Sequence, residues 1–264
     1  MSEFVFKKKY GQNFLSDKNL LKAIAEDAGV DKNSSVLEIG AGAGSLTSVL
    51  DEKTKKVVSF EIDKDLKETL SSLNLKKTKF VFGDFMDFSM EEVEKMFDGR
   101  FKVVANLPYY ITTPIIFKLL EEGKNVESLT IMVQKEVAEK VCANVGDKDY
   151  GILSVMVQFY GTSKISRVVK RQMFFPQPNV DSAILHIEID RKKFKDVDKK
   201  KFSKFVKTCF AMRRKTLLNN LGQAYGKERL KELFDEQTLS RRAESFSLDE
   251  FVSLFEKCEN LTRK

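Results

Sequence analysis

Strand-like and helix-like segments alternate along the first half of the chain, and this alternation constrains the fold more than any other feature. Each strand-like segment is short and apolar, and a stretch with helical spacing follows it. The strand-like segments cover residues 35–39, 56–60, 79–82, 101–105 and 128–133. Strands that alternate with helices at this spacing form a parallel sheet. We therefore expect an α/β fold with a doubly wound, mostly parallel sheet.

The pattern changes in the second half of the chain. Residues 152–160 and 181–189 are strand-like with no helical pattern between them, which predicts an antiparallel pair at one edge of the sheet. After Asp190 the strand-like segments stop. Helical spacing then covers residues 199–212, 215–221, 228–234 and 248–257. We predict two domains, with residues 1–190 forming an α/β domain and residues 191–264 a small all-α domain.

The positive charge is concentrated in the second of these domains. Residues 1–190 contain 26 Lys and Arg against 28 Asp and Glu, whereas residues 191–264 contain 20 against 11. Such a basic region is typical of a protein that binds a polyanion, and we expect nucleic acid. A solvated helical surface is the alternative. The clusters expected to contact nucleic acid are Lys7, Lys8 and Lys9, then Arg213, Arg214 and Lys215, and finally Arg241 and Arg242.

Cysteine usage and hydropathy exclude several classes of protein. The three cysteines are far apart, which predicts reduced thiols in the cytoplasm and neither disulfides nor a zinc site. No apolar run has the length of a membrane span. We therefore expect a cytoplasmic protein that binds neither a membrane nor a metal.

A glycine-rich turn lies between the first strand-like segment and its helix. The turn reads Glu38-Ile-Gly-Ala-Gly-Ala-Gly44, and its glycines permit a tight bend and close approach of a ligand. Glu61, Asp84 and Asn106 end the next three strands, and ligands bind at the carboxyl ends of strands in open parallel sheets. Glu61 can bind both ribose hydroxyls and Asp84 an adenine amino group.

Two cofactors are compatible with a glycine turn and a following acidic residue. Dinucleotide-binding enzymes share the pattern, but the third glycine here comes one residue too early for G-x-G-x-x-G. A nicotinamide-dependent oxidoreductase would also need a proton-relay residue, and the only histidine, His186, lies in the middle of a strand-like segment, where a structural role is expected. The ordered set of glycines, Glu61, Asp84 and Asn106 favours S-adenosylmethionine.

The segment Asn106-Leu107-Pro108-Tyr109 suits the capture of an aromatic amine. The Asn106 side-chain oxygen can accept one hydrogen of the amine, and the Leu107 carbonyl can accept the other. Pro108 stiffens the turn, and Tyr109 offers a flat face on which a base can stack. Phe174 or Phe175 could cover the opposite face, with Phe174 preferred, although core packing explains these phenylalanines equally well.

Several motifs together resemble those of the small-subunit ribosomal RNA adenine N6,N6-dimethyltransferases. The resemblance extends over nearly the whole chain. It includes the glycine turn, Glu61-Ile-Asp63, Gly83-Asp84 and Asn106–Tyr109. It also includes residues 11–15 (Gly-Gln-Asn-Phe-Leu), 174–182 (Phe-Phe-Pro-Gln-Pro-Asn-Val-Asp-Ser) and 213–217 (Arg-Arg-Lys-Thr-Leu).

This resemblance implies a class I S-adenosylmethionine-dependent methyltransferase fold and activity. The substrate would be two neighbouring adenines in a hairpin loop near the 3′ end of small-subunit ribosomal RNA, within an immature small subunit. The implied cofactor-binding residues are Asn13, Leu15, Gly40, Gly42, Glu61, Ile62, Asp84, Phe85 and Asn106. Two alternatives stay open, namely an erythromycin-resistance methylase that modifies large-subunit RNA and a non-catalytic RNA-binding assembly factor on the same fold.

Overall fold

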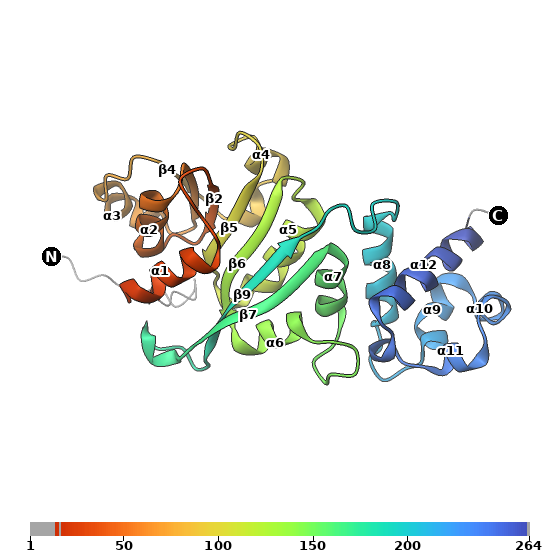
Figure 1. Ribbon diagram of the computed structural model, residues 1–264. Coiled ribbons are helices and arrows are strands. Elements are labelled where there is room, and N and C mark those ends of the chain that lie inside the picture. Colours follow the sequence, from red (N-terminus) through yellow and green to blue (C-terminus); the bar gives the residue numbers. More distant parts are fainter. Residues whose placement is uncertain (1–13, 16, 263–264) are drawn as a thin grey trace. The chain divides into compact units, whose positions relative to one another are not determined.

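The computed structural model describes residues 14–15 and 17–262, which form two compact units (Figure 1). Unit 1 contains the described residues up to Ala138 together with Thr162–Asp190. Unit 2 contains Glu139–Gly161 and the residues from Arg191 onward. A change of unit therefore falls at the 190/191 boundary that the sequence suggests, but the segment Glu139–Gly161 groups with the C-terminal helices instead of with the sheet.

The sheet of unit 1 has seven strands in the order β4-β3-β2-β5-β6-β9-β7. The strands are β2 Ser35–Ile39, β3 Lys56–Glu61, β4 Thr78–Phe82, β5 Phe101–Asn106, β6 Val126–Gln134, β7 Gly161–Val169 and β9 Ser182–Ile189. The pairings from β4 through β6 are parallel, and β9 runs antiparallel to β6. A separate antiparallel ribbon joins β1 Phe14–Leu15 to β8 Phe174–Phe175. The predicted mostly parallel sheet is confirmed.

Helices connect the strands of this sheet. They are α1 Lys18–Asp27, α2 Ser45–Lys53, α3 Lys67–Ser72, α4 Met90–Glu94, α5 Thr112–Glu122 and α6 Lys135–Cys142. From β2 the chain moves outward through β3 to β4, and it then returns to β5 on the other side of β2. Because such crossovers are right-handed, α2 and α3 cover one face while α4 and α5 cover the other.

Burial on both faces explains the composition of the central strands. Val36 of β2 and Val104 of β5 are fully buried and join a hydrophobic cluster with Leu21 of α1 and Leu50 of α2. Strands covered on both faces read as continuous apolar runs instead of alternating ones. The sheet thus forms a rigid base whose carboxyl edge carries the turns described below.

The segment Ile152–Tyr160 was expected to be a strand, and this prediction is wrong. It forms helix α7, which belongs to unit 2 and buries most of its residues. An uninterrupted apolar run fits a buried helix as well as a buried strand, and its β-branched and aromatic residues favoured the strand. The actual edge strand is β7, which is largely exposed and contains Lys164 and Arg167. Its polar composition made this strand hard to recognise from the sequence, and charged side chains are common on edge strands.

Unit 2 is helical, and its core is rich in phenylalanine. Its further helices are α8 Lys199–Cys209, α9 Leu217–Tyr225, α10 Lys227–Leu233, α11 Glu236–Ser240 and α12 Leu248–Thr262. The rings of Phe159 and Phe202 stack with centroids 4.3 Å apart. At the start of α12, Ser247 N donates to Glu250 Oε2 over 2.7 Å and Glu250 N to Ser247 Oγ over 3.3 Å, forming a capping box. None of the helices described between residues 17 and 262 is long and apolar enough to span a membrane.

Candidate active site

The glycine turn after β2 lines a pocket at the carboxyl edge of the sheet. Gly40 has a φ of +86°, and a Cβ at this position would lie 3.5 Å from the carbonyl oxygen of Asn106. Gly44 has a φ of +82°, and a Cβ there would lie 2.3 Å from Leu73 Cδ1. Both positions favour glycine because a positive φ strains other residues, and at Gly44 an added Cβ would also collide with Leu73.

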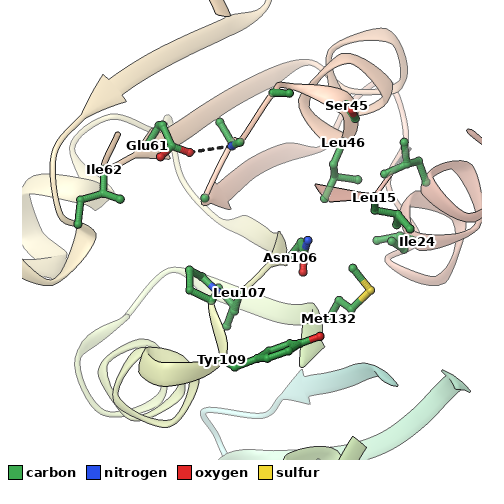
Figure 2. A pocket seen from close by; sticks show the side chains of 16 residues that line it. Leu15, Ile24, Ser45, Leu46, Glu61, Ile62, Asn106, Leu107, Tyr109 and Met132 are labelled. Carbon is green, nitrogen blue, oxygen red and sulfur yellow. Dashed lines mark hydrogen bonds between the residues drawn. The ribbon is translucent and has the colours of Figure 1, made fainter. Parts of the chain in front are cut away.

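The carboxylate of Glu61 is fixed against this turn. Its Oε2 accepts from Gly42 N over 2.7 Å, and its Oε1 accepts from Asp63 N over 2.8 Å. Burial raises the pKa of Glu61, and the hydrogen bonds to the two amides oppose that rise. Figure 2 shows Glu61 at one side of the pocket, joined to the glycine turn. A carboxylate with both oxygens held in place is suited to accept from a pair of neighbouring hydroxyls.

Glu38, near the end of β2, differs from Glu61 in its protonation state. It is fully buried, and its Oε2 accepts from Thr47 Oγ1 over 2.6 Å and from Ser59 Oγ over 2.5 Å. Its Oε1 has no hydrogen-bond partner among the described residues. Burial raises the pKa of Glu38 to about 8, so the carboxyl is mostly protonated at neutral pH. Glu38 therefore supports the turn as a neutral group.

Asn106 ends β5 and extends its side chain into the same pocket (Figure 2). Leu107 N donates to Met132 O over 3.1 Å, which ties the motif to β6. The carbonyl of Pro108 accepts from Ile111 N and from Thr112 Oγ1, so it stabilises the turn that leads into α5. The Pro108 carbonyl is thus used by hydrogen bonds within the turn. We therefore propose the Leu107 carbonyl as the acceptor for the substrate amine.

Tyr109 also lines the pocket, and its hydroxyl is anchored to a distant segment. Its phenolic oxygen lies 2.6 Å from Ser182 Oγ, at the start of β9. Burial raises the pKa of Tyr109, so the hydroxyl stays protonated. The hydrogen bond restrains the ring, whose face is thereby offered to the pocket in a defined orientation.

A second, smaller hollow adjoins the first. Both are lined by Gly40, Ile62 and Pro108. The second hollow also contains Asp84 and Phe85, from the turn that follows β4. The two hollows therefore bring together residues from the ends of β2, β3, β4 and β5, as the sequence predicts. They lie where the strand order reverses between β2 and β5, which is where open α/β sheets bind ligands.

The residues of these hollows fit an adenosine-containing cofactor. The main pocket is open to solvent, and apolar side chains line it together with a few polar groups, as is usual for small-molecule sites. Glu61 could accept from ribose hydroxyls and Asp84 from an exocyclic amine, and Ile62, which lines both hollows, adds apolar surface. Leu15 and Leu46 add further apolar wall beside the glycine turn.

Comparisons with known proteins decide between the families compatible with this site. The ribosomal RNA adenine dimethylase family matches residues 3–260. The small-subunit ribosomal RNA methyltransferase A of Fusobacterium nucleatum is 43% identical, over 96% of this chain and 97% of that protein. The chain belongs to the ribosomal RNA adenine dimethylase family.

Solved structures support the same assignment. A dimethyladenosine transferase from Plasmodium falciparum aligns with a TM-score of 0.80 and 25% identity, covering 94% of this chain and 98% of that chain. The 23S rRNA methyltransferase ErmE aligns with a TM-score of 0.68 and 27% identity, covering 94% and 100%. The predicted methyltransferase fold, the enzymatic activity and the dependence on S-adenosylmethionine are confirmed. The oxidoreductase alternative and the purely non-catalytic alternative are wrong.

Phe174 does not lie where a base-stacking residue was expected. Its side chain is buried in a hydrophobic cluster with Leu15 and Met132, two residues that also line the pocket. The pairing of Phe174 with Leu15 in the β1–β8 ribbon explains this position. Because side chains alternate along a strand, the neighbouring Phe175 is the exposed aromatic, at 68%. In this conformation Phe174 supports the pocket wall from the core.

The basic clusters differ in how much of their charge is available. Arg241 is held within unit 2, with Nη1 2.6 Å from Glu250 Oε1 and its guanidinium 3.9 Å from the centre of the Phe246 ring. This placement argues for a structural role and against the expected RNA contact. Arg242, in contrast, is exposed. Lys7, Lys8, Lys9 and Asn13 lie outside the described residues.

The cluster Arg213, Arg214 and Lys215 is exposed on the loop between α8 and α9. The buried side chain of Asn220 organises this loop, because it accepts from Met212 N over 2.9 Å and donates to the carbonyls of Met212 and Lys215. Arg213 Nη2 also donates to Lys148 O over 3.0 Å. Arg214 and Lys215 are therefore the exposed cations of a structured loop.

Sequence reasoning missed several residues of the site. Ser182 lay within a quoted motif, but no sequence signal linked it to Tyr109, 73 residues earlier. The apolar lining from α1, α2 and β6 was missed because such residues resemble ordinary core positions. These lining residues are Leu21, Ile24, Leu46 and Met132.

Proposed function

We propose that this protein dimethylates the N6 amino groups of two adjacent adenosines in the hairpin loop near the 3′ end of small-subunit ribosomal RNA. The substrate would be the RNA within an immature small subunit in the cytoplasm. This finer assignment follows the sequence resemblance, and the relatives named for small-subunit RNA support it.

The proposed chemistry rests on the residues that line the main pocket. Asn106 and Tyr109 line a single pocket together with the glycine turn and Glu61. The residues assigned to the amine and those assigned to the cofactor therefore face one cavity. An amine held at Asn106 would lie in the space that the cofactor-binding residues also border.

The mechanism needs alignment more than acid–base catalysis. S-adenosylmethionine, when bound, supplies a methyl group already activated by a positively charged sulfur. The adenine nitrogen is a weak nucleophile because its lone pair is delocalised into the ring. The Asn106 side-chain oxygen and the Leu107 carbonyl would each accept one hydrogen of this amine, which favours tetrahedral geometry and exposes the lone pair. The nitrogen becomes positively charged when it gains the methyl group, and it then releases one proton to water, so no general base is required. Positioning of this kind contributes several kcal/mol to rate acceleration in favourable cases.

The target adenine must leave its stack before it can enter the pocket. Tyr109 would stack against the extruded base, in the orientation set by its bond to Ser182. The exposed loop that carries Arg214 and Lys215 would bind RNA phosphates by charge, without reading the sequence. Unit 1 would thus carry out methyl transfer, and unit 2 would contact the RNA phosphates.

Mass spectrometry of ribosomal RNA tests the assignment. We expect small-subunit RNA from cells that lack this protein to contain two unmethylated adenosines at the 3′ hairpin. Purified protein and S-adenosylmethionine should restore both dimethyladenosines on immature small subunits from those cells. Restoration of methylation on large-subunit RNA instead would identify the erythromycin-resistance type of activity and reject the proposal.

A further inference from the structure

Lys118 of α5 is a buried cation close to the cofactor side of the site. Lys118 is only 8% exposed. Burial of an ammonium group is costly unless its N–H groups have hydrogen-bond acceptors. The Nζ atom donates to three main-chain carbonyls, those of Phe85, Met86 and Phe88, over 3.3, 2.9 and 2.5 Å. An ammonium has three N–H donors, so each of them has an acceptor.

All three acceptors belong to the turn that follows Asp84. Within this turn, Asp84 Oδ1 accepts from Met86 N over 2.9 Å, and Asp87 N donates to Asp84 O over 3.0 Å. The Lys118 ammonium also lies 5.3 Å from the centre of the Phe85 ring, close enough for a cation–π contact. The Lys118 ammonium therefore binds three carbonyls of one short turn.

The same turn lines the second hollow of the site through Asp84 and Phe85. Helix α5 begins directly after the Asn106–Tyr109 motif, and Ile115, one helical turn before Lys118, lines that hollow as well. One helix thus connects the amine-binding motif to the turn assigned to the adenine of the cofactor. The three charge-assisted bonds of Lys118 fasten that turn to the helix.

We propose that Lys118 is a positioning residue that holds the turn 84–88 in the geometry required for recognition of the cofactor's adenine. The inference rests on the proposed function in one respect, since it takes Asp84 as the contact to the adenine amine. Loss of Lys118 would leave the Met86 and Phe88 carbonyls without this donor and the Phe85 carbonyl with only its 3.4 Å bond from Phe88 N, and the turn would relax away from the hollow.

The test compares Lys118→Met with the control Lys124→Met, which removes an exposed lysine just after α5. Hydrogen exchange is measured at the amides of Met86, Asp87 and Phe88. Affinity is measured for S-adenosylhomocysteine and for S-inosylhomocysteine, in which a carbonyl replaces the exocyclic amine. Lys118→Gln, which keeps two of the three N–H donors but not the charge, serves if the methionine variant does not fold.

We expect Lys118→Met to speed exchange in the turn and to weaken S-adenosylhomocysteine by about tenfold, the effect of one lost hydrogen bond of ordinary strength. Binding of S-inosylhomocysteine should change little, so the preference for adenine should fall. A variant that is only less stable would keep this preference. Unchanged exchange in the turn, or an unchanged preference despite faster exchange, would overturn the proposal.

The variant Asp84→Ala separates this proposal from the function on which it rests. If Asp84→Ala keeps the wild-type preference for adenine, Asp84 is not the adenine contact, and that part of the proposed site is wrong. The role of Lys118 is then decided by Lys118→Met itself. Faster exchange together with a reduced preference for adenine would support a positioning role for the turn, and an unaltered preference would reject it.

Discussion

The phenolic oxygen of Tyr109 lies 2.6 Å from the Oγ of Ser182, which joins two motifs that are 73 residues apart in sequence. Tyr109 follows the end of β5, and Ser182 begins β9, the strand that runs antiparallel to β6. The orientation of the aromatic platform therefore depends on a segment that contributes no other group to the proposed chemistry.

Ser182→Ala and Tyr109→Phe should each lower kcat/KM for RNA methylation by about two- to tenfold, the effect of one hydrogen bond of ordinary strength. Because both changes remove the same bond, the double variant should be no worse than the more impaired single variant. Steady-state kinetics on immature small subunits would measure this. Fully additive losses would show that the two side chains act independently.

Glu61→Ala should weaken S-adenosylmethionine binding by about 1–3 kcal/mol, because ribose hydroxyls would lose their acceptor. Glu52→Ala, at an exposed position on α2, is the matched control. Isothermal titration calorimetry gives the affinity, and a thermal melt checks that loss of the bonds to Gly42 and Asp63 has not unfolded the turn. Unchanged affinity in a folded Glu61→Ala variant would remove Glu61 from the site.

Glu38 should make stability fall as pH rises. Its pKa in the folded protein is about 8, above the ordinary value of 4.5. Between these values the unfolded chain loses a proton that the folded protein retains. Raising the pH through this window therefore favours unfolding, by at most about 1.4 kcal/mol per pH unit. Below pH 4.5 both states are protonated, so the contribution of Glu38 is fully present and no longer changes with pH.

Glu38→Gln removes this titration and keeps the shape of the side chain. We expect its stability relative to wild type to increase from pH 5 to pH 8 in chemical denaturation experiments. A difference between the two proteins that stays constant across this range would show that Glu38 has an ordinary pKa in the folded protein.

The loop between α8 and α9 should contribute to RNA affinity through charge. Neutralising Arg213, Arg214 and Lys215 together should weaken RNA binding and leave cofactor affinity unchanged. The slope of log affinity against log salt should become shallower by about one unit for each lost phosphate contact. Neutralising the exposed Lys55, Lys67 and Lys76 of unit 1 provides a control with the same change in charge.

The opposite outcome is also informative, because Arg213 bonds to the carbonyl of Lys148 within unit 2. If the cluster serves only to stabilise that unit, the triple variant will melt at a lower temperature and keep its salt slope. An unchanged slope would reject RNA docking by this loop.

The sequence predicted the parts of the fold that depend on local pattern. Segments such as residues 35–39 and 101–105 are apolar and bounded by clear turns, and they form β2 and β5 within one residue of the expected limits. The positions of Gly40, Glu61, Asp84 and Asn106 at strand ends followed from the parallel topology alone. These four residues do line adjoining hollows.

Features that depend on tertiary context could not be predicted in this way. The apolar run Ile152–Tyr160 fits a strand or a helix, and its packing in unit 2 decides for the helix. Phe174 and Phe175 are the same residue type, and only the pairing with β1 determines which one is buried. Lys118 resembles a surface lysine on α5 until the turn after β4 is placed beside it.

The central claim is that Asn106 holds the amine that is methylated. Asn106→Ala should lower the single-turnover rate of methyl transfer on immature small subunits by at least about a hundredfold, as for removal of one preorganised group in an active site. RNA binding and thermal stability should stay close to wild type, as they should in the exposed control Asn33→Ala. Because Asn106 borders the cofactor pocket, the rate is compared at saturating S-adenosylmethionine. A near wild-type rate for Asn106→Ala would contradict the account.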